Sequence, residues 1–308
     1  MTEGCVDSRC EFIAVVGAPN VGKSTLVNRF VGAKVTIVSP KAQTTRARVL
    51  GICIEDLSQL VFIDTPGIFE PRRRLDRAMV AAAWGGASDG DVILLLVDAN
   101  SGVDSNTRKI IEGLKKRGKT VDNFPRIMLV LNKIDVTKKP ALLTLAAQLN
   151  EEGIFSETFM VSALSGNGVG DLLAHLAGHA PKGPWHFPED QISDMPQRLL
   201  AAEITREKLY LQLRQELPYA SAVETEEWHE KEDGSVKISQ VIYIERPTQK
   251  AIILGKGGGR IKSIGEASRK ELKEIFGHDV HLFLFVKVRE KWGDDQERYR
   301  DWGLDFNA

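Results

Sequence analysis

The residues best suited to chemistry stand near the start of the chain, in the run from Gly17 to Ser24, which reads G-A-P-N-V-G-K-S. The run follows an apolar stretch and precedes one with helical spacing, a setting typical of a phosphate-binding loop. Backbone N–H groups of such a loop converge on phosphate oxygens at a helix N-terminus. Lys23 would reach the same oxygens, and the Ser24 hydroxyl would bind Mg²⁺. The alternative interpretation is a glycine-containing turn into an ordinary helix.

Three further motifs each follow an apolar run. In Asp64–Gly67 (D-T-P-G), the carboxylate can hold Mg²⁺ and the Gly67 N–H can reach a γ-phosphate. In Asn132–Asp135 (N-K-I-D), the Asp135 carboxylate can accept two N–H donors together, which suits the edge of guanine and not that of adenine. Ser162–Leu164 (S-A-L) is placed for a backbone N–H to reach guanine O6. Each motif alone is a plausible turn, but the four in this order predict a guanine nucleotide site.

Short apolar runs alternate with helical patterns up to about residue 180, and this pattern predicts the elements that position the motifs. Continuous Val/Ile/Leu strands separated by helices indicate an α/β domain, with a mainly parallel sheet covered by helices on both faces. Ligands bind such sheets at the carboxyl ends of the strands, where all the motifs fall. The predicted strands are 11–16, 49–55, 60–63, 91–97, 127–131 and 158–161, and the predicted helices are 23–31, 74–87, 105–117, 140–151 and 169–178.

These motifs resemble those of the P-loop GTPase family, and the run Gln43-Thr44-Thr45-Arg46 resembles the Era-type members. The resemblance implies GTP and GDP as ligands and Mg²⁺ as cofactor. It implies Lys23, Thr45 and Gly67 as catalytic residues, and it favours Thr45 over Thr44 as the second hydroxyl on Mg²⁺. The metal ligands are then Ser24, Thr45 and Asp64, and the GTP-binding residues are Gly17, Asn20, Val21, Gly22, Lys23, Ser24, Thr25, Asp64, Thr65, Pro66, Gly67, Asn132, Lys133, Asp135, Ser162, Ala163 and Leu164.

The residue after the D-T-P-G motif is Ile68, where Ras-like enzymes carry a glutamine that orients the attacking water. An apolar side chain cannot orient water, so we expect slow intrinsic hydrolysis. Related GTPases with a hydrophobic residue here use K⁺ held by an asparagine of the phosphate loop, and Asn20 matches that position. Two roles therefore stay open for Asn20, which are binding K⁺ and shaping the loop.

A second kind of motif, Gly255–Gly258 (G-K-G-G), lies between apolar residues and fits the GXXG loop of a KH domain, which clamps four single-stranded nucleotides. Residues 185–308 carry 19 Lys/Arg and 23 Asp/Glu, whereas 246–273 carry eight against two. A positive patch on an acidic domain is the footprint of one nucleic-acid strand. A glycine-rich entry to a solvated basic helix is the alternative. The expected RNA-binding residues are Gly255, Lys256, Gly257, Gly258, Arg260 and Lys262.

The second half of the chain predicts a helix at 198–216, strands at 220–230 and 235–246, and a helix followed by a strand at 280–288. This order resembles an α+β type II KH domain. We expect an N-terminal extension (1–10), a GTPase domain (11–181), a proline-rich linker (182–197), the KH domain (198–290) and a C-terminal tail (291–308).

The resemblance to Era-type GTPases then extends over essentially the whole chain. It implies binding to the 3′ end of small-subunit (16S) rRNA and a role in assembly of the 30S ribosomal subunit. In a second hypothesis, the KH-like domain docks a protein or a membrane instead. The resemblance also leaves open a peripheral contact with the inner membrane.

Composition sets broader bounds. At 43% hydrophobic and 27% charged residues with net charge −1, the chain has the make-up of a globular protein. Three cysteines favour a reducing compartment over a disulfide framework. No apolar run approaches the roughly 18 residues that span a bilayer, and the start does not resemble a signal peptide. We therefore expect a cytoplasmic monomer without a transmembrane segment.

Overall fold

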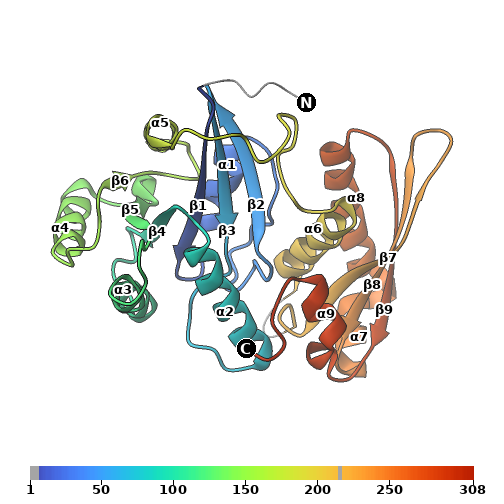
Figure 1. Cartoon of the computed structure of the whole chain (residues 1–308). Helices are drawn as coiled ribbons and strands as arrows, with labels where there is room; N and C mark the ends of the chain where they lie inside the picture. Colours follow the sequence, from blue (N-terminus) through green and yellow to red (C-terminus); the bar gives the residue numbers. More distant parts are fainter. Residues whose placement is uncertain (1–6, 214–216) are drawn as a thin grey trace. The chain divides into compact units, whose positions relative to one another are not determined.

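The computed structural model describes residues 7–213 and 217–308, and it divides the chain into two compact units (Figure 1). The first unit takes in the residues up to Thr36, then Thr45–Asp194 and Tyr299–Ala308. The second comprises Ile37–Thr44 and Met195–Arg298. Each unit has its own sheet.

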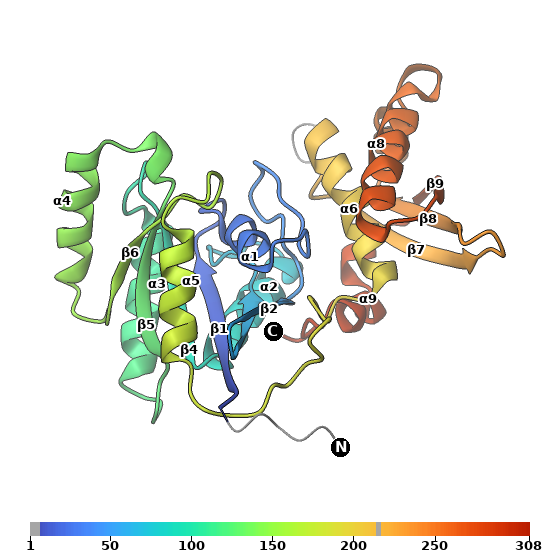
Figure 2. The same ribbon diagram turned by 90° about the horizontal axis from the view of Figure 1, so that it is seen from above.

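The first unit is built on a six-stranded sheet in the order β2-β3-β1-β4-β5-β6. All neighbouring pairs are parallel except β2 and β3, so the predicted mainly parallel sheet is confirmed. Helices α1 and α5 pack side by side against β2 and β3, and α2 packs on β1 (Figures 1 and 2). The strands are β1 (Arg9–Gly17), β2 (Val49–Glu55), β3 (Ser58–Asp64), β4 (Val92–Asp98), β5 (Arg126–Asn132) and β6 (Thr158–Met160); the helices are α1 (Lys23–Val31), α2 (Arg74–Ser88), α3 (Ser105–Gly118), α4 (Lys139–Asn150) and α5 (Val169–His179).

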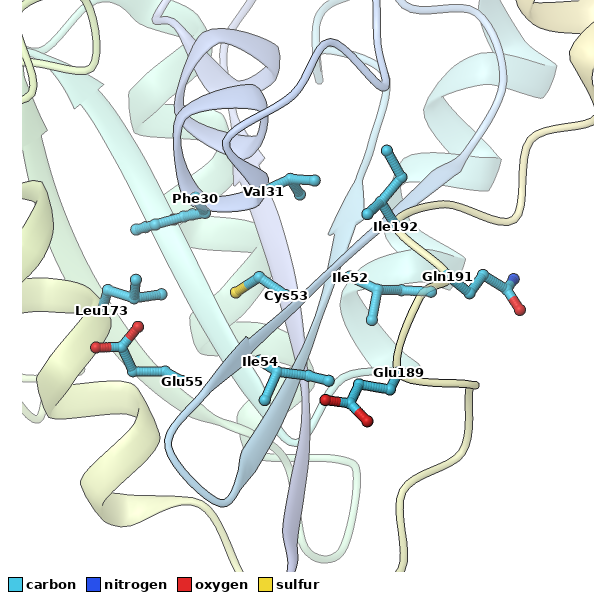
Figure 3. A pocket seen from close by; sticks show the side chains of 10 residues that line it. All are labelled: Phe30, Val31, Ile52, Cys53, Ile54, Glu55, Leu173, Glu189, Gln191 and Ile192. Atoms are coloured by element: carbon cyan, nitrogen blue, oxygen red, sulfur yellow. The ribbon is translucent and has the colours of Figure 1, made fainter. Parts of the chain in front are cut away.

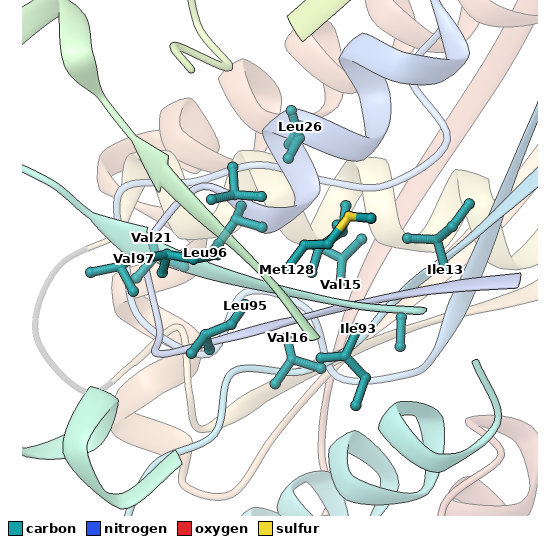
Figure 4. Close-up of a cluster of buried hydrophobic side chains, with 14 of the residues drawn as sticks. Ile13, Val15, Val16, Val21, Leu26, Ile93, Leu95, Leu96, Val97 and Met128 are labelled. Atoms are coloured by element: carbon teal, nitrogen blue, oxygen red, sulfur yellow. The ribbon is translucent and has the colours of Figure 1, made fainter. Parts of the chain in front are cut away.

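The central strands form the core of this unit (Figure 4). Ile13 and Val15 of β1, Leu95 of β4 and Met128 of β5 are fully buried. Parallel strands that are covered on both faces must be apolar on both sides, which is why the sequence reads as unbroken apolar runs there. The polar motif residues begin where these strands end, at one edge of the sheet.

The second unit has a three-stranded sheet in the order β7-β8-β9. Strand β8 is antiparallel to β7 and parallel to β9, and α6 and α8 pack against the sheet. The predicted helix 198–216 ends at Gln212, and 214–216 lie outside the described residues. Helix α7, which was not predicted separately, precedes the GKGG run. The elements are α6 (Gln197–Gln212), β7 (Ser221–Glu230), β8 (Val236–Ile244), α7 (Pro247–Leu254), α8 (Gly259–Phe276) and β9 (Val280–Val288).

The end of the chain folds with the first unit from Tyr299 onwards, a residue within the short helix α9 (Gln296–Asp301). Tyr299 and Leu304 are buried against Ala78 and Met79 of α2. The last ten residues therefore extend the apolar surface on which α2 packs.

A cavity of about 230 Å³ lies beside the edge strand β2 (Figure 3). Its lining includes Phe30 of α1, Leu173 of α5, Cys53, and Glu189, Gln191 and Ile192. Burial raises the pKa of the Cys53 thiol to about 12, so this thiol is protonated at neutral pH. None of the lining residues belongs to the motifs. Over the residues that the structure describes, no helix is long and apolar enough to cross a membrane.

The packing of the central sheet generates a stability prediction. Leu95→Ala removes a fully buried side chain and should lower the free energy of unfolding of the first unit by about 2–5 kcal/mol, because a cavity remains. Leu143→Ala on α4, where the side chain is 66% exposed, should change it by less than about 0.5 kcal/mol. Hydrogen exchange of the β5 amides in the full chain measures both changes, and equal protection in the two variants would contradict the described core.

Candidate nucleotide site and glycine-rich loop

The phosphate-binding loop joins the end of β1 to α1, which begins at Lys23. Gly22 has φ 100°, and a Cβ placed there would lie 2.3 Å from Nδ2 of Asn132. Only glycine fits such a position. The Lys23 ammonium donates to the carbonyl oxygens of Gly17 (3.1 Å) and Ala18 (2.9 Å). Burial lowers the pKa of Lys23 to about 8, although the Asp64 carboxylate opposes the shift.

Asp64, at the end of β3, gathers the hydroxyl groups of the site. One carboxylate oxygen, Oδ2, accepts from Ser24 at 2.7 Å and from Thr45 at 3.5 Å, and the two hydroxyl oxygens lie 2.9 Å apart. The other oxygen, Oδ1, is buried and has no hydrogen-bond partner among the described residues. An orphaned carboxylate oxygen beside two hydroxyls is the hard oxygen donor set that suits Mg²⁺. The three residues named as metal ligands therefore meet, and they fit that ion.

Thr36 also reaches this cluster, and the motifs did not indicate it. Its buried hydroxyl donates to Asp64 Oδ2 at 3.0 Å. Thr44, the alternative to Thr45, is engaged elsewhere, because its hydroxyl bonds to Ser39 (2.6 Å) and to the Lys41 carbonyl (2.8 Å). The structure thus favours Thr45 over Thr44 for the place beside Asp64.

Asn132 ties three of the motifs together. Its side-chain amide donates to the Val21 carbonyl at 2.7 Å, and its carbonyl oxygen accepts from the backbone N–H of Ala163 at 2.9 Å. Lys133 donates to the Asn20 carbonyl at 2.8 Å. Asp135 is exposed and forms no ion pair within the described residues. Asn132 and Lys133 therefore assemble the loops, whereas the Asp135 carboxylate is open to a ligand.

Two further residues support the base side of the site and were not singled out from the sequence. Asp98, at the end of β4, forms an ion pair with Lys133 at 2.6 Å. Arg29 of α1 donates to the Ala163 carbonyl at 3.2 Å and also to the Leu164 carbonyl. Asp98 could have been found by the same rule as the motifs, since it ends a buried strand. Arg29 carries no such signal.

The Asp64–Gly67 motif approaches the phosphate-binding loop closely. A Cβ at Gly67 would lie 2.9 Å from the backbone nitrogen of Pro19, so a larger residue would push the two loops apart. The Thr65 hydroxyl donates to the Val15 carbonyl at 2.9 Å, which is a structural contact. Ile68 is 5% exposed and packs in the core. Its side chain is held away from solvent and cannot orient a water molecule.

In the second unit, the GKGG run forms the turn between α7 and α8. Gly255, Gly257 and Gly258 have φ values of 72°, 59° and 75°. A Cβ at Gly255 would lie 2.8 Å from Cβ of Arg260, so the turn is tight there. Lys256 is exposed at its tip. A Cβ at Gly257 or Gly258 would meet nothing within 4 Å, so this part of the loop presents bare backbone and one ammonium group.

The charges around this loop decide what it can bind. Lys256, Lys262, Arg269 and Lys270 are exposed, and none of them forms an ion pair within 217–308 or the other described residues. Arg260 instead donates to the Ile252 carbonyl at 2.8 Å, where it braces the loop. Lys256 and Lys262 lie at the turn, and Arg269 and Lys270 follow about 15 Å further along α8 by its helical rise. Together these exposed cations form a surface suited to phosphates.

Comparisons with known proteins find relatives of both units of the chain. Residues 12–133 match the family model described as a 50S ribosome-binding GTPase, and residues 216–293 match the KH domain model. The chain is 61% identical over 301 residues to GTPase Era of Sinorhizobium medicae, covering 98% of this chain and 95% of that protein. GTPase Era of Brucella suis is 59% identical, with coverage of 97% and 94%.

Two solved structures are similar over almost the whole chain. A crystal structure of Era in complex with MgGDPNP and nucleotides 1506–1542 of 16S ribosomal RNA gives a TM-score of 0.89 at 39% identity, covering 96% of this chain and 99% of that one. An Aquifex aeolicus Era variant bound to GDP·AlF₄⁻ gives the same values. The sequence identity, the two family models and the shared fold lead to one conclusion: this chain belongs to the Era family of GTPases.

Proposed function

We propose that this protein binds and hydrolyses GTP with Mg²⁺, and that it binds the 3′ end of 16S rRNA in assembly of the 30S subunit. The observation that carries the nucleotide part is the convergence of Ser24, Thr45 and Asp64 on one point. The relatives' complexes with MgGDPNP and with 16S rRNA nucleotides support the same ligands here.

The base is recognised by Asp135 in this proposal. Asn132 and Lys133 hold the surrounding loops, so the carboxylate stands at a fixed place on the short helix Ile134–Val136. Two parallel N–H donors of guanine satisfy one carboxylate, whereas adenine offers no such pair. The backbone N–H groups of Ser162–Leu164 would bind O6. The Asn132 contact to Ala163 holds this segment in position.

Hydrolysis depends on charge stabilisation at the phosphates. Lys23 would leave its two carbonyl partners for β- and γ-phosphate oxygens, whose charge would raise its depressed pKa again. Gly67 would donate its N–H to the γ-phosphate, and Ser24, Thr45 and Asp64 would hold Mg²⁺, which neutralises phosphate charge when it is bound. Because Ile68 cannot orient water, the intrinsic rate is slow. Asn20 is the candidate to hold K⁺.

The second unit binds single-stranded RNA in this proposal. The GKGG turn lets a phosphate backbone lie against the main chain, and the exposed cations at Lys256, Lys262, Arg269 and Lys270 supply charge. These cations favour RNA over a docked protein. We infer that the protein acts as a cytoplasmic monomer, and a peripheral contact with the inner membrane rests on the family resemblance alone.

Nucleotide choice tests the Asp135 assignment. A site that hydrogen-bonds a substrate group can reject an analogue lacking it by roughly 10⁴–10⁵, so GTP should be preferred over ATP on that scale. Asp135→Asn should weaken the binding of GTP and strengthen the binding of xanthosine triphosphate. The control Asp122→Asn, at an exposed position, should change neither affinity. Titration calorimetry measures these affinities. Equal binding of ATP and GTP by the unmodified protein would refute the assignment.

Single-turnover hydrolysis tests the role of Lys23. Lys23→Ala should slow the reaction about 10²–10³-fold, the loss typical of removing one donor to transition-state charge. Ile68→Ala should have a far smaller effect on the rate, and Ile68→Val, which leaves a smaller cavity, should have almost none. The reverse order of effects would overturn the proposed roles.

Cation dependence in the same assay tests Asn20. A rate that K⁺ raises above the rate in Na⁺ should lose this stimulation in Asn20→Ala. Equal rates in the two salts would leave Asn20 only the role of shaping the loop.

RNA binding tests the GKGG turn. Changing both Lys256 and Gly257 to Asp puts two negative charges into the approach of a phosphate backbone and should abolish binding to a single-stranded oligonucleotide of the 16S rRNA 3′ end. GTP affinity should stay unchanged. In the unmodified protein, affinity should fall by about 0.7 log units per log unit of salt for each phosphate contacted.

A matched pair, Lys119→Asp with Gly153→Asp, makes the same charge change at exposed positions of the first unit, where Gly153 also has a left-handed φ of 70°. Fluorescence anisotropy should show normal RNA binding for this control. If the Lys256 and Gly257 variant bound RNA equally well, the second unit would be assigned to protein docking.

A further inference from the structure

The geometry points to a second nucleic-acid contact on the outer face of β9, where Phe283 and Phe285 would stack against the bases of a single strand. Along β9 the residues alternate. Leu282, Leu284 and Val286 pack towards the apolar clusters formed with α6 and α8, so Phe283 and Phe285 point to the opposite face of the sheet. Phe283 is 48% exposed and Phe285 is 52% exposed. Two half-exposed aromatic rings on one strand form a surface that a binding partner can cover.

Apart from the buried Val241, which lies beside Phe285 in the register, the described neighbours of the two rings on β8 are polar, and a lysine stands beside Phe283. The register puts Ser239 beside Phe283 and Lys237 beside His281. The Lys237 ammonium lies 5.7 Å from the centroid of the Phe283 ring. Lys287 is paired with Glu226 at 2.9 Å, and Glu227 accepts a hydrogen bond from Ser239 at 3.0 Å. Both neighbouring carboxylates are therefore engaged, whereas Lys237 forms no ion pair within the described residues.

This arrangement suits nucleobases better than an apolar protein surface. Two aromatic residues at i and i+2 stand roughly 6.6 Å apart along a strand. In some RNA-binding modules, aromatic side chains on the face of a sheet stack against two or three bases. Such stacking occurs with any base, so it does not require a particular nucleotide sequence. A protein partner would need a larger apolar patch, but Ser239 and Lys237 border the rings here.

The position of β9 connects this face with the GKGG turn. Strand β9 is an edge strand, and its inner face packs against α7 and α8, the two helices that the turn joins, so an RNA strand that leaves the turn would reach the outer face of β9 across this edge. A GXXG loop holds about four nucleotides, so a longer strand must leave the turn over a neighbouring surface. The inference rests on the proposed RNA binding, and it assigns the following bases to Phe283 and Phe285.

Two oligonucleotides separate this contact from the turn: a single-stranded 5-mer and a 12-mer that carries the same sequence plus seven further nucleotides. Stacking on one ring typically changes affinity about 5- to 150-fold per base. Changing both Phe283 and Phe285 to Ala should therefore lower the affinity for the 12-mer at least about tenfold, and the affinity for the 5-mer less than about twofold. The double Leu variant should bind the 12-mer as weakly as the double Ala variant. The double Tyr variant should bind it as well as the unmodified protein, because only Tyr keeps an aromatic ring.

A 2-aminopurine base in the added part of the 12-mer reports stacking directly. Its fluorescence should be quenched by the unmodified protein and the double Tyr variant, but not by the double Leu variant. If the 12-mer bound all variants equally, or if Leu restored binding as well as Tyr, the stacking contact would be wrong and an apolar protein partner would be the better assignment. Failure of the unmodified protein to bind even the 5-mer would instead defeat the proposed RNA function itself.

Discussion

The nucleotide site of the first unit depends on one buried carboxylate, that of Asp64. Burial raises the pKa of Asp64, and the Ser24 hydroxyl, the Lys23 ammonium and the Thr36 hydroxyl act against this shift. A charged group in the interior is tolerated only when hydrogen bonds or opposite charge surround it. The first turn of α1, which supplies Ser24, and the segments that supply Thr36 and Thr45 must therefore meet at the end of β3. The oxygen that no protein group satisfies, Oδ1, is left for a cation.

The sequence predicted much of this site because each motif residue stands directly after an apolar strand, and parallel strands end at one edge of a sheet. That rule places Asp64, Asn132 and Ser162 together without any knowledge of strand order. It could not reveal Thr36, which lies in an irregular segment, or Arg29, whose contacts to Ala163 and Leu164 depend on how a helix packs. These contacts depend on tertiary geometry, and local sequence does not encode it.

In the second unit, too, local sequence predicted some elements and could not predict others. Alternation in Val236, Ile238, Val241-Ile242 and Ile244 predicted β8, and the glycines predicted the turn. Helix α7 is only eight residues long, and its few apolar residues could equally be a strand, so periodicity could not separate it from its surroundings. The parallel pairing of β9 with β8 could not be predicted from local sequence either, because it joins segments about forty residues apart in the chain.

The division of the chain also has a consequence for its connectivity. The chain passes between the two units four times, after Thr36, Thr44, Asp194 and Arg298. The short segment 37–44 is held by α6, where Arg206 donates to the Thr44 carbonyl at 2.6 Å, and residues 299–308 are held by α2. A single cut in the proline-rich linker 182–197 would thus leave each fragment with a segment that folds into the unit formed mainly by the other fragment. Each unit is therefore assembled from segments that lie on both sides of that cut in the sequence.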